Sequence, residues 1–161
     1  MQLVVLAGGF GTRLRGVIPE GLPKPMAAIA GKPFLEHLFN RAIAQGVSEI
    51  HLLVGYAAEV ITKHFGDEYR GVPVTYSVES IPLGTGGALK AAKPHLADDF
   101  LLVNGDVWTD FDFAKLPHDP AGLAHLDLRE DDPRRLQGAI EEACYRVFAA
   151  GHTSVLSSKL M

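Results

Sequence analysis

Residues 1–25 read MQLVVLAGGFGTRLRGVIPEGLPKP, and this stretch decides the class of fold. It begins with an apolar run, QLVVLA (2–7), which is typical of a buried strand. A loop rich in glycine and basic residues follows this strand at once. Ligands of open α/β sheets bind beyond the carboxyl ends of the strands. If the rest of the chain builds such a sheet, this loop therefore lies at its ligand-binding edge.

The rest of the chain alternates strand patterns with amphipathic helix patterns. In 33–46, apolar residues share one face and Gly46 ends the pattern, whereas His37, Asn40 and Arg41 fall on the polar face, where we expect solvent. Strands separated by helical crossovers predict an α/β fold: a three-layer, Rossmann-like, mostly parallel sheet with helices on both faces. Strands are predicted at 48–55, 72–78, 99–106, 122–130 and within 152–158, and helices at 33–46, 57–66, 85–96 and 132–151.

Composition excludes several classes of protein. The 161 residues predict one domain, 1–161, and 47% hydrophobic with 21% charged residues is globular. A net charge of −4 argues against nucleic-acid binding, and the lone Cys144 against a disulfide framework or a cysteine-based zinc site. No apolar run approaches the length of a membrane span, and the N-terminus lacks a signal-peptide pattern. We therefore expect a cytoplasmic protein without membrane partners.

The glycine loop points to a phosphate ligand. Gly8, Gly9 and Gly11 allow positive φ and a close backbone approach, which exposes N–H groups to an anion. The dinucleotide fingerprint G-x-G-x-x-G fails, because Leu14 stands at its last glycine, and no window fits the Walker loop. A different kind of phosphate loop is therefore required.

The segment GGFGTRL…LPKP (8–25) resembles the signature of the sugar-1-phosphate nucleotidyltransferases, which make NDP-sugars. The likeness continues in GKPFLEH (31–37), PLGTGGAL (82–89) and LLVNGDVW (101–108), each in the family's order. It covers roughly residues 1–126, the nucleotide-binding part. The first part is most similar to heptose- and mannose-1-phosphate guanylyltransferases, and 101–116 to N-acetylmuramate-1-phosphate uridylyltransferases.

The resemblance implies that an oxygen of a sugar-1-phosphate attacks the α-phosphorus of GTP or UTP and expels pyrophosphate. Backbone N–H groups of the glycine loop would hold the triphosphate, fork-shaped Arg13 suits the departing pyrophosphate, and Lys24 suits the transferring phosphoryl group. The alternative for both side chains is a solvated loop charge. The implied nucleotide-binding residues are Leu6, Ala7, Gly8, Gly9, Gly11, Thr12, Arg13, Lys24, Glu79, Gly84 and Thr85, and the implied catalytic residues are Arg13, Lys24 and Asp106.

Asp106 ends an apolar strand at the ligand edge, where one carboxylate with phosphate oxygens and water suits Mg²⁺. The alternative is an Asx turn that closes the strand. Asn104 is expected to reach a sugar hydroxyl. Glu79 and Gly84 flank the base-reading position that the resemblance implies. A carboxylate only accepts hydrogen bonds, so Glu79 there favours guanine, permits uracil and disfavours adenine; the alternative is an exposed strand-end charge.

The sequence also departs from the family pattern. Arg13 and Lys24 are one residue further apart than expected, as if Gly21 were inserted, which predicts a bulged loop. Residues 129–161 resemble nothing in the family and end before its second metal-binding aspartate, which suggests a fragment, a frameshifted product or a compact variant. Two functions therefore stay open: a sugar-1-phosphate nucleotidyltransferase, or a non-catalytic nucleotide-binding module. The sugar and the oligomeric state are not specified.

Overall fold

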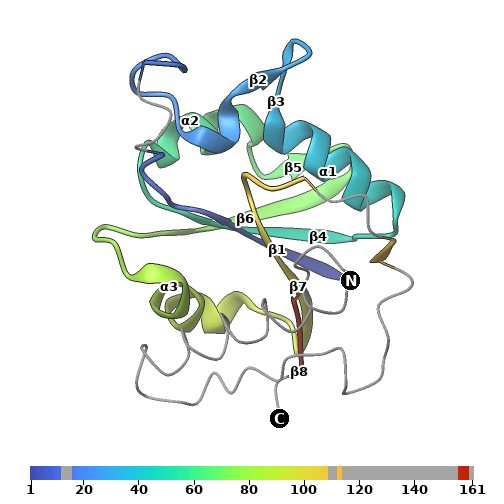
Figure 1. Ribbon diagram of the computed structural model, residues 1–161. Helices are drawn as coiled ribbons and strands as arrows, with labels where there is room; N and C mark the ends of the chain where they lie inside the picture. The colour runs from blue at the N-terminus through green and yellow to red at the C-terminus, as the bar shows by residue number, and fades with distance from the viewer. Residues whose placement is uncertain (12–15, 109–111, 114–155, 160–161) are drawn as a thin grey trace, which may run out of the picture.

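The computed structural model describes residues 1–11, 16–108, 112–113 and 156–159 (Figure 1). Within these ranges, six strands form one sheet in the spatial order β5-β6-β4-β1-β7-β8. The four central strands are parallel, whereas the edge strands β5 and β8 run antiparallel to their neighbours, which confirms the predicted mostly parallel sheet. The bounds are Gln2–Ala7 for β1, Glu49–Val54 for β4, Glu68–Tyr69 for β5, Val72–Val78 for β6, Asp99–Asn104 for β7 and Leu156–Lys159 for β8.

The path of the chain reverses at β1. From β1 it moves outward through β4 to β6, and α3 then carries it back to β7 on the other side of β1. Among the described strands, the one that follows β1 in sequence after the hairpin, β4, lies on one side of the β1–β7 pair, and the one that follows β7, β8, lies on the other. In open α/β sheets such a reversal opens a crevice between two strands, and this crevice is where ligands bind.

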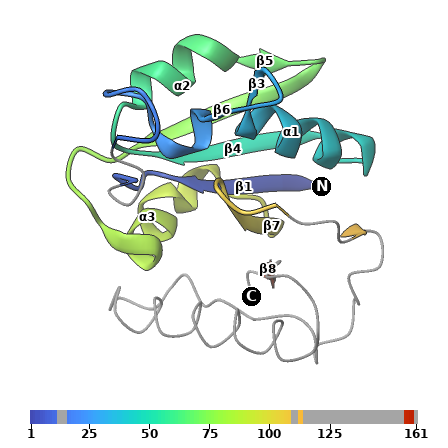
Figure 2. The same ribbon diagram turned by 45° about the horizontal axis from the view of Figure 1, so that its top comes forward.

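Helices cover both faces of the sheet, as predicted (Figures 1 and 2). Helices α1 (Phe34–Ala44) and α2 (Ala58–Phe65) lie on one face, and α3 (Gly84–Ala92) lies on the other. Gly66, with φ +63°, ends α2 at the residue that the sequence indicated. A short 3-10 helix, η3 (Lys93–His95), follows α3 directly and contains Pro94, which cannot donate the backbone hydrogen bond that would continue α3.

Each face of the sheet has its own buried core. Alternate residues of a strand point to opposite faces, so Leu3 and Val5 pack under α1 while Val4 points toward α3. On the α1 side, the Phe39 ring lies 4.7 Å from Phe65, centroid to centroid. Among the described residues, the buried apolar side chains that do not belong to the cluster on the α1 side are Val4, Leu53, Ala88, Leu89, Ala92, Phe100 and Leu102.

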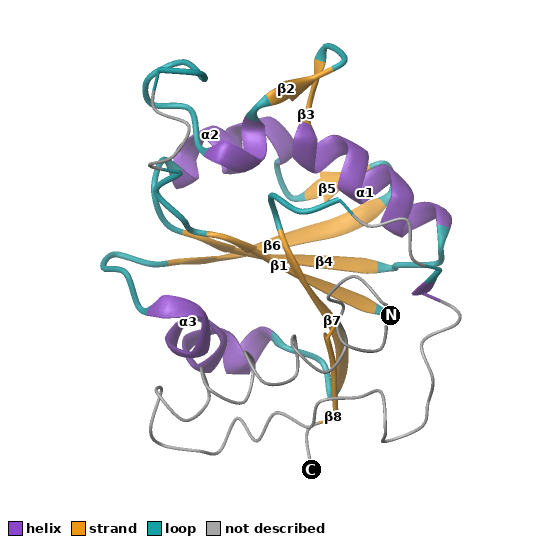
Figure 3. Ribbon diagram, viewed as in Figure 1, coloured by secondary structure: helices purple, strands orange, loops and turns teal. Residues whose placement is uncertain are grey.

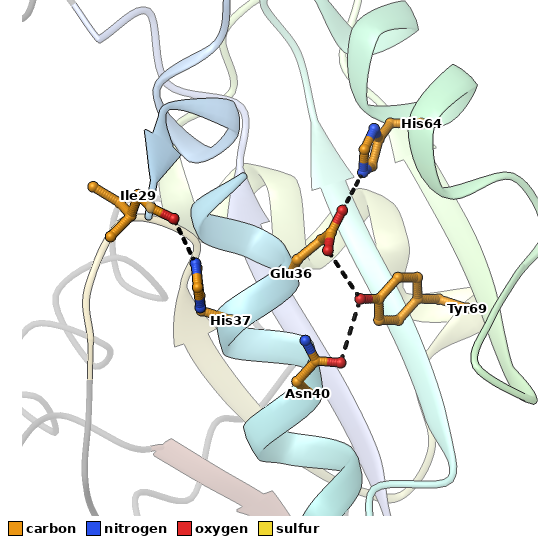
Figure 4. A network of polar contacts seen from close by, with 6 residues as sticks. All are labelled: Ile29, Glu36, His37, Asn40, His64 and Tyr69. Carbon is orange, nitrogen blue, oxygen red and sulfur yellow. Dashed lines mark hydrogen bonds and ion pairs between the residues drawn. The ribbon is translucent and has the colours of Figure 1, made fainter. Parts of the chain in front are cut away.

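A polar network joins α1, α2 and β5 on the outside of this core (Figure 4). The Glu36 carboxylate contacts His64 Nε2 at 2.8 Å and accepts from the Tyr69 hydroxyl at 3.4 Å. Asn40 Oδ1 also accepts from the Tyr69 hydroxyl, at 3.3 Å. His37 Nε2 lies 2.8 Å from the Ile29 carbonyl oxygen and ties a hairpin to α1. The expectation that His37 and Asn40 simply face solvent is therefore wrong, because both side chains connect α1 to its neighbours.

The shortest elements were not predicted (Figure 3). They are the 3-10 helix η2 (Lys24–Met26), the hairpin of β2 (Ala28–Ile29) and β3 (Lys32–Pro33), and β5. The hairpin turns through Ala30 and Gly31, both with positive φ. The predicted strand within 152–158 overlaps β8 only at its end, and the elements predicted at 122–130 and 132–151 lie outside the described residues.

Candidate active site

A cavity of about 510 Å³ opens at the carboxyl ends of β1 and β7, beside the first turn of α3. It lies at the reversal of the chain path described above. Thr12 and Arg13 lie outside the described residues, but every other residue that we predicted for the site lines this cavity. These are Leu6, Ala7, Gly8, Gly9, Gly11, Lys24, Glu79, Gly84, Thr85, Asn104 and Asp106.

The three glycines of the loop, Gly8, Gly9 and Gly11, have different structural surroundings. The backbone is left-handed at Gly11 (φ +58°), where an added Cβ would also lie 3.1 Å from Lys24 Cβ. Gly8 packs against the loop after β4: its carbonyl oxygen accepts from Tyr56 N–H at 3.4 Å. Around Gly9 the space is open, with no atom within 4 Å of an added Cβ. Positive φ, which we predicted for all three glycines, therefore occurs at Gly11 alone.

Lys24 reaches the cavity from η2, whose next two residues, Pro25 and Met26, are buried and anchor the segment. The Lys24 ammonium forms an ion pair with Asp106, the second residue after β7, so the two predicted catalytic charges lie side by side. Gly21 has φ +80° in a turn in which Leu22 N–H donates to the Pro19 carbonyl at 3.2 Å. Gly21 therefore lies in a tight turn, whereas Arg13, from which the predicted bulge was measured, lies outside the described residues.

Close backbone packing brings Asp106 to the end of β1. Gly105 N–H donates to the Leu6 carbonyl at 2.9 Å, and an added Cβ at Gly105 would lie 3.0 Å from that same oxygen. Asn104 precedes this contact as the last residue of β7. The turn at residues 104–107 is closed by a backbone hydrogen bond, in which Val107 N–H donates to the Asn104 carbonyl at 3.4 Å. The Asp106 carboxylate instead contacts Lys24. This carboxylate is thus free of the Asx-turn role that was the alternative.

The donor set fits a hard cation that shares its shell with a ligand. Among the described residues, no group of three or more His, Cys, Asp or Glu side chains converges on a metal site. Of the two carboxylates among the described lining residues, Asp106 is the one beside β7, and its side chain is partly exposed. Mg²⁺ commonly binds one or two protein carboxylates and takes its remaining oxygens from phosphates and water.

Glu79 holds the opposite end of the cavity, directly after β6. Its N–H donates to the Val54 carbonyl at 2.8 Å, and its Oε2 accepts from Leu83 N–H at 3.3 Å, so the carboxylate is fixed beside the start of α3. The side chain is half-buried and lines the cavity with Gly84 and Thr85. This position differs from the exposed strand-end charge that was the alternative for Glu79.

Sequence reasoning missed five residues of the lining, all of them apolar: Phe10, Pro25, Leu53, Pro82 and Ala88. Leu53 and Ala88 have the same apolar spacing as core residues, so the sequence could not distinguish them as lining residues. Phe10 did carry a signal, because a large aromatic residue inside a glycine loop has no core to enter.

Comparison with known proteins agrees with this geometry. Residues 2–121 match the family model described as nucleotidyl transferase. This chain belongs to the nucleotidyl transferase family. It is 46% identical over 116 residues to a D-glycero-alpha-D-manno-heptose 1-phosphate guanylyltransferase of Campylobacter jejuni, covering 72% of this chain and 52% of that protein. It is also 44% identical over 106 residues to the UTP–glucose-1-phosphate uridylyltransferase AglF of Haloferax volcanii, covering 66% of this chain and 43% of AglF.

Solved structures of nucleotidyl transferases share the fold. HddC from Yersinia pseudotuberculosis, crystallised with GMP-PN, superposes with a TM-score of 0.63 at 40% identity, over 71% of this chain and 51% of HddC. A UDP-glucose pyrophosphorylase, at 18% identity and a TM-score of 0.57, supports the fold alone. The chain spans about half the length of the curated relatives it matches. No helix in the described ranges is both long enough and apolar enough to cross a membrane.

Proposed function

We propose that this nucleotidyl transferase chain carries the nucleotide site of an enzyme that transfers a nucleoside monophosphate from GTP or UTP to a sugar-1-phosphate. The observation that carries the proposal is the single cavity shared by the glycine loop, Glu79 and the Lys24–Asp106 pair. Relatives that act on sugar-1-phosphates support the reaction class. The alternative, a non-catalytic nucleotide-binding module, would use the same cavity.

In the proposed reaction, an oxygen of the sugar-1-phosphate forms a bond to the α-phosphorus of the nucleotide. The bond from that phosphorus to the bridging oxygen breaks, and pyrophosphate leaves with the electron pair. Both reactants are anions, so the work of the protein is to neutralise charge and to hold the phosphates in line. Lys24 supplies a fixed positive charge, and the open backbone around Gly9 admits phosphate oxygens to its N–H groups. Arg13 is expected to bind the departing pyrophosphate.

Asp106 would hold Mg²⁺, which supplies Lewis-acid neutralisation of the phosphates when bound. Lys24 beside it would then face the same phosphates, because the two side chains are in contact. An exposed carboxylate of similar chemistry, Asp67, lies after α2 and away from the cavity lining. Asp67 therefore offers a matched control for the loss of the Asp106 charge.

The base preference follows from Glu79. Guanine presents two adjacent donors on its Watson–Crick edge, uracil presents one, and adenine presents a donor beside an acceptor. A carboxylate held by Leu83 N–H faces the base as an acceptor, so GTP is preferred to UTP and UTP to ATP. The guanylyltransferases among the relatives support this order.

Release of pyrophosphate tests the proposal. The chain is incubated with Mg²⁺, one of the three nucleotides and a panel of sugar-1-phosphates. We expect slow pyrophosphate release with GTP or UTP and one of the sugar phosphates, loss of this release in Asp106→Asn, and release at the wild-type rate in Asp67→Asn. Nucleotide binding without pyrophosphate release from any pair would favour the binding module. Binding of none of the nucleotides would refute both functions.

A further inference from the structure

Two aromatic side chains stand exposed side by side at the rim of the cavity. Phe10, in the glycine loop, is 54% exposed, and Tyr56, after β4, is 37% exposed. Their ring centroids lie 5.6 Å apart with the planes tilted by 43°. Phenylalanine is among the residues most often fully buried, as Phe39 and Phe100 are here. An exposed Phe10 ring beside a cavity therefore needs an explanation other than packing.

The backbone fixes this aromatic pair in place. The Gly8 carbonyl accepts from Tyr56 N–H, and an added Cβ on Gly55 would lie 3.0 Å from that carbonyl oxygen. The glycine loop and the loop after β4 are thus in contact without room between them. Tyr56 supports one side of the Phe10 ring, and Phe10 itself lines the cavity.

The pair belongs to the same end of the cavity as Glu79. Strands β4 and β6 are hydrogen-bonded neighbours, and Tyr56 and Glu79 each follow the carboxyl end of one of them. Gly8, two residues before Phe10, has its Cβ position 3.7 Å from Glu79 Oε2. A ligand whose edge meets Glu79 therefore has Phe10 within the same region of the cavity.

We propose that the Phe10 ring, supported by Tyr56, is an aromatic wall on which the nucleobase stacks, and that this wall favours purines. The inference rests on the proposed function of the cavity and deepens it. Hydrogen bonds read the edge of a base, whereas stacking uses its face, so Glu79 and Phe10 contribute independently. The two fused rings of a purine present a larger face than the single ring of a pyrimidine, and stacking gains accordingly.

Affinities for three ligands test the wall: GTP, UTP and inorganic tripolyphosphate, each with Mg²⁺, measured by isothermal titration calorimetry. Phe10→Leu keeps an apolar side chain but removes the flat ring. We expect it to weaken GTP about tenfold and UTP about threefold or less, and to leave tripolyphosphate unchanged. Phe10→Trp should keep the wild-type affinity for GTP. Ile81→Ala, at a residue that is 65% exposed and outside the cavity lining, is the matched control.

Each other result overturns the inference. Equal losses for all three ligands in Phe10→Leu would show that Phe10 only supports the glycine loop. Unchanged GTP affinity would show that the base does not touch the ring. Circular dichroism of each variant checks the fold, and the retained binding of Phe10→Trp keeps the result interpretable. A wild-type chain that binds none of the ligands would refute the proposed function itself, whereas binding that ignores Phe10 would refute the aromatic wall alone.

Discussion

Gly11 combines a left-handed backbone conformation with a close contact. Its φ is +58°, a backbone angle that residues with a Cβ rarely adopt, and an added Cβ would lie 3.1 Å from Lys24 Cβ. Gly11→Val therefore displaces both the loop that would hold the triphosphate and the lysine beside it. We expect GTP binding to be abolished in calorimetry while the far-ultraviolet circular dichroism spectrum stays that of the wild type.

Gly46→Val is the control for backbone strain. Gly46 has φ +86° after α1, and no atom lies within 4 Å of an added Cβ. It shares the positive φ of Gly11 but has no contact with Lys24 or the cavity. GTP affinity should survive this change, and wild-type affinity in Gly11→Val would contradict the role of the loop.

At the level of single residues, the charged residues and the glycines in the sequence indicated where the cavity lies. Gly11, Lys24 and Asp106 have chemistry that a strand–loop pattern makes conspicuous, and the structure brings them to one cavity. Apolar lining residues such as Leu53 were not predictable, because the same letter at the same spacing builds a core. The ion pair between Lys24 and Asp106 was not predictable either, since it depends on how β7 lies against β1. The catalytic roles of these residues remain predictions.

At the level of elements, β4 and β6 share a buried polar contact that makes stability depend on pH. His51 on β4 is fully buried, with Nδ1 2.7 Å from Thr75 Oγ1 and Nε2 2.9 Å from Ser77 Oγ, both on β6. Burial first, and then the His95 ring stacked 5.6 Å away, lower the pKa of His51 to about 4, against a smaller opposite effect of Glu49.

The sign of this effect follows from proton binding. Between pH 6.5 and 4 the unfolded chain protonates His51 and the folded chain does not, so stability falls as the pH falls through this window. Across this whole window, the free energy of unfolding falls by up to about 3 kcal/mol. Urea unfolding at pH 7, 5.5 and 4.5 measures it, with His51→Gln as the comparison because its other ionisable groups are unchanged. Equal pH dependence in both proteins would contradict the assignment.

Helix α3 couples its packing to the cavity through Gly87. An added Cβ there would lie 2.8 Å from Leu83 Cβ, an atom fixed to the backbone, so the first turn of α3 must shift. Gly84 and Thr85 on that turn line the cavity. We expect Gly87→Ala to weaken GTP binding several-fold. The melting temperature should change little, because the higher helix propensity of alanine, about 1 kcal/mol, offsets the cost of shifting the first turn.

Ala91→Ser, on the exposed face of the same helix, is the matched control for Gly87→Ala. It changes α3 without touching Leu83, so GTP affinity should remain at the wild-type value. An unchanged affinity in Gly87→Ala as well would show that the first turn of α3 does not position the nucleotide.

The longer elements were predictable because their apolar periodicity is written into the sequence. The strand predicted at 72–78 is β6, residue for residue, and Gly66 ends α2. The two-residue strands β2, β3 and β5 were missed, since two residues show no period. Their existence depends on a hairpin turn and on pairing with β6, which are properties of the folded chain.

For the whole molecule, the class of fold could be predicted and the strand order could not. Alternating strand and helix patterns imply a parallel sheet, but they do not say which strand lies beside which. Only the assembled sheet places β1 between β4 and β7 and thereby opens the crevice at their carboxyl ends. The division of the chain near residues 126–129 and its cytoplasmic location remain predictions.

A nucleotide that binds across this crevice stabilises the molecule as a whole. At the proposed site it would contact the ends of β1, β6 and β7 together with α3, a set of residues that comes together only in the folded chain. At a ligand concentration of about 100 times Kd, binding adds about 2.7 kcal/mol to the free energy of unfolding. For a chain of 161 residues this corresponds to a rise in melting temperature of roughly 5–10 °C. Thermal unfolding with Mg²⁺ and each nucleotide at one fixed concentration should rank the shifts GTP, then UTP, then ATP. A larger shift with ATP than with GTP would contradict Glu79 as the acceptor that reads the base, and equal shifts with all three would place the binding energy in the phosphates alone.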